Sequence, residues 1–379
     1  MRGVYIHIPF CQQICHYCDF NKVFLKNQPV DQYIESIGLE FQLMKEAGHS
    51  FEQVETVFLG GGTPTALSVP QLDRLLTIVE QYIDIPALRE FTTEANPDDL
   101  SEAQLCILKE KGVTRLSIGV QSFNERLLNQ IGRTHSVDDV ECVISTARNI
   151  GFENISLDLM YGLPTQTVTE WEETLDRALS LDLPHYSAYS LIVEPKTVFY
   201  NRMTKGKLPL PGEDAEAEMF GMVIDRMNAS NRMQYEISNF AIPDYPSFHN
   251  LIYWENLNYA GIGAGAHGYL GKQRYANVGP LKHYIDHLEE GKLPIKEVHE
   301  VTQAESMEEE MFLGLRKIEG VSMEHFKQKF KKPILEVFGK PIHDLQQQGM
   351  LQIVDDQLCL TRKGIFQGNA VFQQFLLEV

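Results

Sequence analysis

Short runs of apolar and β-branched residues alternate with longer amphipathic stretches through the first half of the chain. The apolar runs have the length of strands, and the stretches between them repeat their apolar residues at the spacing of a helix. The predicted strands are 4–10, 56–62, 89–97, 113–121, 154–164 and 185–195, and the predicted helices are 31–47, 69–83, 101–111, 136–149 and 168–181. This alternation predicts parallel βαβ units, whose sheet either closes partly into a barrel or stays open.

Short polar residues stand at the predicted starts of four of these helices, at Asp31, Ser68, Ser101 and Ser136. Such side chains accept a hydrogen bond from a free backbone N–H of the first turn, so we expect them to act as caps. Other polar residues and glycines fall just after the strands. Because parallel strands end at the same edge of their sheet, we expect a functional site at the carboxyl edge.

The pattern changes after residue 195. Residues 213–229 are predicted to form a helix, and residues 235–270 are rich in aromatic residues and glycine. Three further predicted helices, at 303–318, 322–331 and 333–348, are followed by a predicted hairpin at 350–361. Three helices and a hairpin are typical of a winged-helix-like α+β domain, which is often a DNA-binding module.

Charge and composition exclude several classes of function. The chain has 379 residues, more than one hydrophobic core usually serves, and a formal net charge of -19. This charge argues against non-specific binding to nucleic acid or to anionic membranes. Residues 300–379 carry twelve acidic against nine basic residues, so we expect no nucleic-acid binding by the C-terminal domain either.

The chain shows no feature of a membrane or secreted protein. No run of 18 apolar residues is present, so no transmembrane segment is expected, and the first residues do not have the pattern of a signal peptide. The six cysteines are few for this length and three of them are clustered, which is the cysteine usage of a reducing compartment. We therefore expect a cytoplasmic protein.

The clustered cysteines are Cys11, Cys15 and Cys18, in a C-x3-C-x2-C pattern that Phe20 follows. Thiolates bind soft metals and iron–sulfur clusters. Three of them can hold three irons of a [4Fe–4S] cluster and leave the fourth iron open to another ligand. A zinc site is the alternative, but it needs a fourth protein ligand, for which His7 or His16 is available. The pattern favours the iron–sulfur cluster.

Six motifs in order over residues 5–164, YIHIPFC, CHYCDF, GGGTP, EANP, GVQSF and DLMYGLP, resemble those of the radical S-adenosylmethionine (SAM) superfamily. More narrowly, they resemble the oxygen-independent coproporphyrinogen III oxidase family. The resemblance implies a partial (β/α)6 TIM-like barrel and a [4Fe–4S] cluster with SAM at its open iron. In that chemistry an electron passes from the cluster to SAM and gives a 5′-deoxyadenosyl radical, so an electron-donor protein is an expected partner.

With this resemblance the chain divides into three parts. We expect a radical SAM partial barrel over 1–200, a barrel extension over 201–300 and a C-terminal winged-helix-like domain over 301–379. The resemblance also implies which residues contact SAM. These are Tyr5, Tyr17, Gly61, Gly62, Thr63, Glu94, Gln121, Arg133 and Asp158. It assigns no catalytic residue.

Several of these residues are notable without the resemblance. Gly60–Gly62 directly follow an apolar strand, where a glycine turn exposes backbone N–H groups to a ligand. Glu94 stands at a strand end, which suits the hydroxyls of a ribose. Asp158 lies inside an apolar strand, and a buried acid there costs several kcal/mol unless it is paired or hydrogen-bonded. Arg133 is either the ion-pair partner of Asp158 or a contact for a ligand carboxylate.

The segment HNLIYW at 249–254, together with Phe20 in place of a fourth cysteine, is similar to the haem-chaperone (HemW) branch of this family. The resemblance implies haem binding by a set of four residues. These are His249, Asn250, Tyr253 and Trp254. A histidine is a common axial ligand of haem iron and aromatic rings pack against a macrocycle, although a packed core histidine is the other interpretation of His249. His267, in GIGAGAHGY, is a second candidate or part of the cofactor wall.

Two functions from different classes follow. In the first, the protein binds haem and delivers it to an acceptor protein, and the SAM–cluster site supports that transfer. In the second, it is an enzyme that uses the radical on coproporphyrinogen III or another porphyrinogen. The absence of a cysteine at position 20 favours the chaperone, while the SAM-contacting residues keep the enzyme as the alternative.

Overall fold

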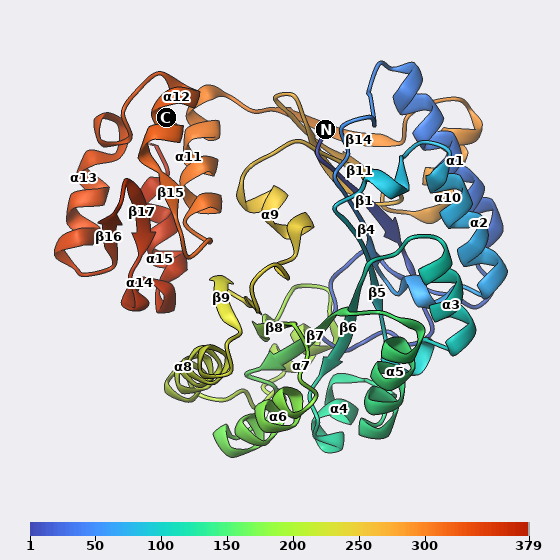
Figure 1. Ribbon diagram of the computed structural model, residues 1–379, viewed down its shortest axis with the longest axis horizontal. Helices are drawn as coiled ribbons and strands as arrows, with labels where there is room; N and C mark the ends of the chain where they lie inside the picture. Colours follow the sequence, from blue (N-terminus) through green and yellow to red (C-terminus); the bar gives the residue numbers. More distant parts are fainter. Residues whose placement is uncertain (378–379) are drawn as a thin grey trace.

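The computed structural model describes residues 1–377 and centres on a twelve-stranded sheet (Figure 1). Seven adjacent strands are parallel, in the order β11 (Tyr259–Ile262), β1 (Gly3–Ile8), β4 (Thr56–Gly61), β5 (Glu90–Ala95), β6 (Arg115–Gln121), β7 (Asn154–Tyr161) and β8 (His185–Ser190). Antiparallel strands extend it on both sides: β12 (His267–Leu270), β13 (Gln273–Asn277) and β14 (Ile295–Glu300) after β11, and β10 (Asn239–Ala241) and β9 (Met233–Glu236) after β8. The described sheet ends at β14 and β9 and does not close, which confirms the predicted partial barrel.

Helices cover the outer face of the parallel strands (Figure 1). They are α1 (Val30–Glu46), α2 (Val69–Glu80), α3 (Glu102–Glu110), α4 (Glu125–Ile131), α5 (Val137–Ile150), α6 (Val168–Ser180), α8 (Glu213–Ala229) and α10 (Leu281–Glu289). Single-turn 3₁₀ helices lie at Pro64–Ala66, Ile85–Ala87, Pro97–Asp99 and Gln373–Phe375. Every second residue of β1, Val4, Ile6 and Ile8, is buried in one apolar core with residues of these helices. The residues between them face the other way, as expected for strands.

Alternate residues of the parallel strands form a polar inner face. Hydrogen bonds join Tyr5 to His7 and Ser117 to Asp158, and Arg115 contacts His185. A barrel interior usually holds packed apolar side chains. The polar inner face therefore serves a purpose other than packing a core.

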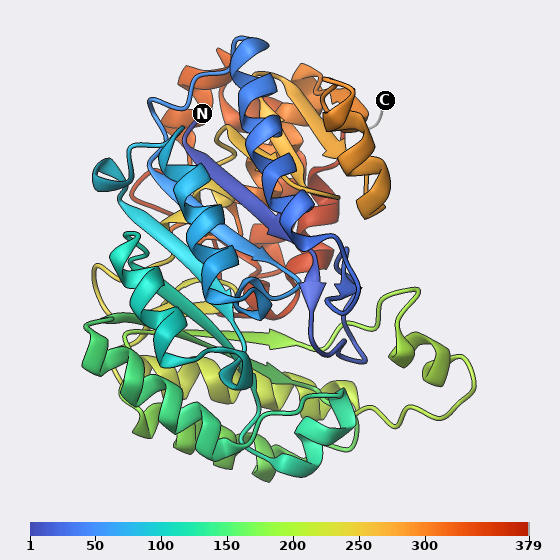
Figure 2. The same ribbon diagram turned by 90° about the vertical axis from the view of Figure 1, so that its right-hand side faces the viewer.

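Two short excursions border the carboxyl edge. The strands β2 (Phe10–Cys11) and β3 (Val23–Phe24) pair beside the cysteine loop. The helix α7 (Val198–Met203) lies in the segment that protrudes beside them in Figure 2, and the Phe199 N–H donates to the carbonyl of His16. The two excursions thus lie together at the edge where the parallel strands end.

The C-terminal domain has a core of its own. It contains α11 (Gln303–Gly314), β15 (Val321–Ser322), α12 (Met323–Phe330), α13 (Ile334–Gln347), β16 (Leu351–Val354), β17 (Gln357–Leu360), α14 (Arg362–Phe366) and α15 (Gly368–Phe372). The three strands form one sheet in the order β15-β17-β16, and the buried residues from Met307 to Phe375 pack on it. Helices on a small hairpin-containing sheet confirm the predicted winged-helix-like domain, whose last two residues, 378–379, lie outside the described part.

The helix α9 (Phe248–Trp254) lies between the sheet and the C-terminal domain (Figure 1). The domain also contacts the barrel through a β-bridge between Glu236 and Lys317 and through paired Arg362 and Asp225 side chains. The predicted division at 200 and 300 stays a prediction. Residues such as Tyr284 and Phe240 of the expected extension share the core of the barrel rather than forming a separate one.

The structure differs from the sequence-based expectations in some local details. Ser68, Ser101 and Ser136 form capping boxes as expected, but α1 is capped at Pro29 and Asp31 lies in its first turn. The prediction that Asp31 is a cap is therefore wrong. The expectations also missed α4, whose seven residues are too few to show a helical period. None of the helices in the described residues has the length and apolar character needed to span a bilayer.

Candidate functional site

The cysteine loop leaves the end of β2 at the carboxyl edge of the parallel strands. Cys11, Cys15 and Cys18 are all free thiols. Burial raises the pKa of Cys11 to about 12, the hydroxyl of Thr63 lowers it, and the neighbouring Cys18 and Cys15 raise it again. The Thr63 hydroxyl lies 3.9 Å from the Cys11 sulfur. The three thiols are thus close enough to influence one another's charge, as ligands of one cluster must be.

The histidines considered for a zinc site are occupied elsewhere. The ring of His7 is hydrogen-bonded on both sides, to the Tyr5 hydroxyl at 3.1 Å and to the Asn21 carbonyl at 2.7 Å. His16 uses its Nδ1 on the carbonyl of Gln130 at 2.8 Å. Within residues 1–377 no three His, Cys, Asp or Glu side chains, the three cysteines included, are arranged as ligands of a single metal ion. His7 is bonded at both nitrogens and His16 keeps only its Nε2, so the chemistry of three free thiols favours a cluster with one open iron over zinc.

The glycine turn after β4 lies against the same thiol. Gly61 has a φ of 115°, in the left-handed region that favours glycine. A Cβ on Gly62 would lie 2.9 Å from the Cys11 sulfur and 2.8 Å from the Phe10 carbonyl oxygen, so no side chain fits there. The turn thus keeps the backbone beside Cys11 free of side chains, which is a cradle for a ligand.

Glu94 and Asp158 are the buried carboxyls of the inner face. Burial raises the pKa of Glu94 to about 7, although the Gly61 N–H donates to its Oε2 at 3.0 Å and lowers it. Burial also raises the pKa of Asp158, which accepts hydrogen bonds from Ser117 at 3.2 and 3.1 Å. The charge of Asp158 raises the pKa of Glu94 further, so Glu94 is suited to hydrogen-bond hydroxyl or amino groups of a ligand.

Arg133 connects the cysteine loop to the strand ends. It follows α4 and donates to the Tyr17 hydroxyl at 3.2 Å and to the side-chain oxygen of Asn96. Asn96 in turn donates to Thr63 at 3.0 Å. Arg133 does not pair with Asp158, which the Ser117 hydroxyl holds instead. Its Nε is buried without a partner among the described residues, which leaves one donor for a ligand carboxylate.

Gln121 is the last residue of β6 and stands at the same carboxyl edge. Its φ is 66°, rare for a residue with a side chain, and the pairing of β6 with β7 shifts register just before it. A strained residue at a strand end is typical of a functional site. A cavity of about 280 Å³ opens between the cysteine loop and Arg133. Its lining includes Gln12, Cys15, Asn96, Asp99, Gly132 and Thr134.

The structure therefore brings most of the predicted SAM residues into one region. Hydrogen bonds connect Thr63 to Cys11 and Arg133 to Tyr17, and the backbone N–H of Gly61 to Glu94. Tyr5 lies deeper, with its ring stacked on Phe58. The free donor on Arg133, the glycine cradle and the buried carboxyls fit a ligand that carries a carboxylate, an amine and hydroxyls, as SAM does.

Two residues of this region were missed from the sequence. Asn96 was quoted in the EANP motif but given no role, although it joins Arg133 to Thr63. Asn21 ends the cysteine loop and donates to the carbonyls of Ala264 and Gly279 at 2.8 and 2.9 Å. The GIGAG turn thus holds the loop in place. No periodicity signals this contact, because its partners are more than 240 residues apart in the chain.

The HNLIYW segment lies at the opposite end of the barrel. Its helix α9 sits against the first residues of the parallel strands, because Glu90, at the start of β5, accepts hydrogen bonds from the Phe248 and His249 N–H groups. The His249 ring is wholly buried and bonded at both nitrogens, 2.8 Å from Thr56 Oγ1 and 2.8 Å from the Tyr253 hydroxyl. Burial lowers its pKa to about 3. In this conformation neither nitrogen is available to iron.

The other residues of the segment face the C-terminal domain. Tyr253 and Trp254 line a cavity of about 400 Å³ between α9 and α11, together with Tyr259, Arg274, Glu309 and Phe312. The Arg316 guanidinium lies 4.4 Å above the Trp254 ring. Asn250 is half-buried on the same helix, and its N–H donates to Ser247. His267 is exposed at the start of β12, near the cysteine loop rather than α9. Burial lowers the pKa of His7, and the nearby His267 lowers it further.

Comparison with protein families matches two models to this chain. The model "Radical SAM superfamily" matches residues 5–178, and the model "HemN C-terminal domain" matches residues 301–366. The first range contains the cysteine loop and all nine predicted SAM residues. The second coincides with most of the winged-helix-like domain.

Curated relatives extend over the whole chain. A protein of Bacillus subtilis named "Heme chaperone HemW" is 51% identical over 381 residues, which cover 100% of both chains. Another of that name from Lactococcus lactis is 45% identical and covers 100% of this chain and 98% of its own. Among solved structures, the coproporphyrinogen III oxidase of Escherichia coli, described as a radical SAM enzyme, matches with a TM-score of 0.85 at 22% identity. It covers 100% of this chain and 91% of its own, and at that identity it shows the fold alone.

Proposed function

The chain belongs to the HemW family within the radical SAM superfamily, and from this membership we propose that it is a haem chaperone that binds haem and passes it to acceptor proteins. The observation that carries the proposal is the 51% identity with a HemW protein along the full length of both chains. We place the protein in a reducing compartment, the cytoplasm, where the free thiols Cys11, Cys15 and Cys18 persist.

The first part of the proposal concerns the carboxyl edge. Cys11, Cys15 and Cys18 hold a [4Fe–4S] cluster, and the cradle at Gly61 and Gly62 receives SAM beside it. Such a cluster with SAM supplies one-electron reductive chemistry when both are bound. The support is the set of three free thiols, the glycine surface against Cys11 and the free donor of Arg133.

The protein side chains then orient the nucleotide. Arg133 binds its carboxylate, while Glu94 accepts hydrogen bonds from amino or hydroxyl groups. Thr63 and Asn96 keep Arg133 aligned with the cysteine loop. An electron-donor protein is required as a partner for reduction, and the protruding segment beside the loop leaves its thiols half-exposed at Cys15 and Cys18.

The second part concerns haem. Tyr253 and Trp254 offer aromatic faces to the macrocycle in the cavity between α9 and α11. Arg274 lines the same cavity but is paired with Glu309 at 2.6 Å, so it binds a propionate only by leaving that carboxylate. For His249 to bind iron there, the Tyr253 hydroxyl has to leave its ring nitrogen, because the two are bonded at 2.8 Å. Asn250 and His249 thus take part only after α9 rearranges.

The alternative, oxidation of coproporphyrinogen III, has less support. It shares the fold and the SAM-contacting residues, but the relatives that match along the full length are haem chaperones, and Phe20 stands where a fourth cysteine is expected for that enzyme. Phe20 is 62% exposed beside the loop, so an exposed apolar side chain replaces a cysteine there.

The deciding experiment uses anaerobically reconstituted protein loaded with haemin. We expect haem to pass to an added apo-globin, seen as a shift of the Soret absorption, at a rate above that of free haemin in albumin. Coproporphyrinogen III supplied with SAM and a reductant is expected to remain unchanged by chromatography. Release of decarboxylated product without haem transfer would replace the chaperone with the enzyme.

A further inference from the structure

Two stretches of chain border the cysteine loop at the carboxyl edge. Residues 19–28 follow Cys18, and residues 191–210 form the protruding segment that contains α7 (Figure 2). We call the two stretches together the basic rim. They contain six basic and two acidic residues, whereas the whole chain has 33 basic and 52 acidic residues. The six are Lys22, Lys26, Lys196, Arg202, Lys205 and Lys207. A chain with a net charge of -19 thus has a local excess of positive charge beside its clustered thiols.

The protein does not neutralise this positive charge itself. Within residues 1–377 no side chain of the basic rim forms an ion pair. Lys22 donates to the Cys18 carbonyl, and the Arg202 guanidinium lies 5.8 Å from the centre of the Phe199 ring. The acidic first turn of α8 follows the rim in the chain, but its Glu216 is held by the Ser190 hydroxyl at the end of β8. The cations of the rim are therefore available to a partner.

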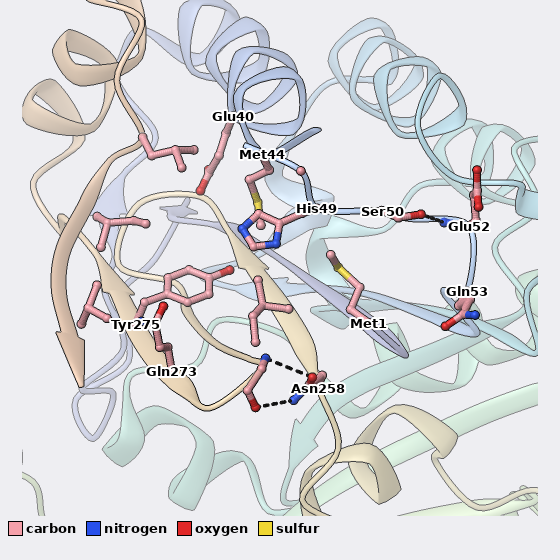
Figure 3. Close-up of a pocket in the computed structure, with 16 residues that line it drawn as sticks. Met1, Glu40, Met44, His49, Ser50, Glu52, Gln53, Asn258, Gln273 and Tyr275 are labelled. Carbon is pink, nitrogen blue, oxygen red and sulfur yellow. Dashed lines mark hydrogen bonds between the residues drawn. The ribbon is translucent and has the colours of Figure 1, made fainter. Parts of the chain in front are cut away.

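Exposed apolar side chains are interspersed with these cations. They are Phe20, Phe24, Ile192, Val198, Met203 and Leu210. Protein interfaces are enriched in aromatic residues, methionine and arginine, which the rim also contains. The exposed Ile295 and Val298 instead line a cavity of about 640 Å³ at the amino edge (Figure 3). Its lining includes Glu40 and Glu52 and no lysine or arginine, so this second apolar surface differs from the rim in charge and lies at the other end of the strands.

The basic rim is joined directly to the cysteine loop. The Phe199 N–H of α7 donates to the His16 carbonyl at 3.0 Å, and the centres of their two rings lie 6.0 Å apart. Tyr17, between two of the cysteines, packs in the same apolar cluster as Phe199. Cys15 and Cys18 are both half-buried. A protein that covers the rim therefore comes close to the thiols.

We infer that the basic rim is the docking surface of the electron-donor protein, and that this donor carries acidic side chains around its own redox group. The inference rests on the proposed iron–sulfur cluster and names the surface and the charge of a partner that the proposed function requires. The step transfers one electron: the donor is oxidised by one electron, the [4Fe–4S]²⁺ cluster is reduced to [4Fe–4S]⁺, and no bond breaks. Because electron transfer slows steeply with distance, the donor has to dock beside the thiols, which the rim borders.

Local charge governs the encounter with such a donor. At physiological ionic strength charges are screened beyond about 8 Å, so the acidic residues elsewhere on the chain act weakly at the rim. Opposite charges on two surfaces steer their encounter and raise the association rate by about 10- to 1,000-fold. An anionic membrane would also be attracted to apolar and basic residues, but membrane contact gives no reason for their position around the thiols. The observations therefore favour a protein donor.

The test measures reduction of the cluster in the full-length, anaerobically reconstituted protein by a reduced plant-type [2Fe–2S] ferredoxin, an acidic one-electron carrier of low potential. Lys205→Glu combined with Lys207→Glu reverses two exposed charges of the rim and leaves the cysteine loop unchanged. We expect the second-order rate of reduction to fall by about 10- to 100-fold at low ionic strength, and the difference to vanish in about 0.5 M salt. Calorimetric titration of oxidised ferredoxin is expected to show the same loss of affinity without any turnover. Dithionite needs no docking surface and is expected to reduce both proteins at rates within about twofold.

Lys327→Glu combined with Lys332→Glu is the matched control. These exposed lysines of the C-terminal domain form no ion pair within residues 1–377, and the change in net charge is the same, so ferredoxin is expected to reduce this variant like wild type. The inference is overturned if the two double variants are reduced at equal rates. It is also overturned if the rim variant loses binding to phosphatidylglycerol vesicles and keeps its rate with ferredoxin. Either result leaves the cluster and haem transfer, and so the proposed function, intact. If the wild type forms no [4Fe–4S] cluster, the first part of the proposed function and this inference fail together.

Discussion

The two ends of the parallel barrel are built on opposite principles. At the carboxyl edge the polar groups are left partly unsatisfied: Arg133 has a free donor, Gln121 is strained and Gly62 keeps space beside a thiol. At the amino edge α9 closes the interior, and the His249 ring is bonded on both sides. Both ends carry residues that the sequence predicted to bind a ligand.

The comparison shows how to distinguish a ligand site from a set of buried polar residues that only closes the barrel. A buried polar group costs free energy unless it has partners, so an unbonded group beside a cavity, such as the Nε of Arg133, is a place where a ligand can supply one. His249 and Glu90 meet their needs within the protein, and the helix they hold seals the barrel. The polar groups around Arg133 are not all bonded within the protein, and they remain able to bind a ligand.

The largest effect is expected at the carboxyl edge. Cys15→Ala removes one of the three sulfur donors, and we expect nearly complete loss of cluster iron after anaerobic reconstitution, because a cluster held by two thiolates is not retained. The measurement is iron and sulfide content with the visible absorption spectrum. Cys106→Ala, an exposed cysteine on α3, is the matched control and is expected to keep the cluster. Equal iron in the two variants would contradict the ligand assignment.

The sequence predicted the carboxyl edge better than the amino edge. Gly61, Glu94 and Gln121 stand at the carboxyl ends of strands, and parallel strands end together, so their proximity was foreseeable from the order of elements. The hydrogen bond between Arg133 and Asn96 was not, since it depends on the path of a short helix that periodicity does not reveal.

The arrangement at the amino edge could not be predicted from the sequence. The position of α9 depends on Glu90 and Thr56, which belong to strands far away in the chain and carry no motif. The side on which His249 lies is therefore set by tertiary contacts, and no local pattern distinguishes a buried histidine from a ligand.

The second prediction tests the amino edge, which α9 closes, by a change of pH. Burial holds the folded-state pKa of His249 at about 3, against 6.5 for the free side chain. The neutral ring is therefore favoured in the folded state, so its contribution is complete above pH 6.5 and is lost as the pH falls toward 3. Between pH 6.5 and 5 we expect the wild type to lose about 2 kcal/mol more stability than His249→Gln, which does not titrate.

Urea unfolding of both proteins at the two pH values measures this difference. Other groups with shifted pKa values, such as Glu94 and His185, are common to the two proteins and cancel in the comparison. At neutral pH the variant is itself expected to be less stable by about 1–3 kcal/mol, because Thr56 or Tyr253 loses its partner. Parallel pH profiles for the two proteins would show that His249 is solvated rather than sealed.

An effect of similar size is expected for SAM affinity when Arg133 is replaced. Arg133→Ala removes the free donor, and one hydrogen bond to a charged group contributes about 1.5–3 kcal/mol, so SAM binding is expected to weaken by about 10- to 100-fold. Calorimetric titration of SAM into reconstituted protein measures it, with the cluster spectrum as evidence that the loop is intact. Arg126→Ala is the control, since this exposed arginine on α4 pairs with Glu170 and donates to the Thr165 hydroxyl, away from the cysteine loop. If both variants bound SAM equally, the open donor at the carboxyl edge would be a packing defect, and the distinction between the two ends of the barrel would no longer rest on ligand binding.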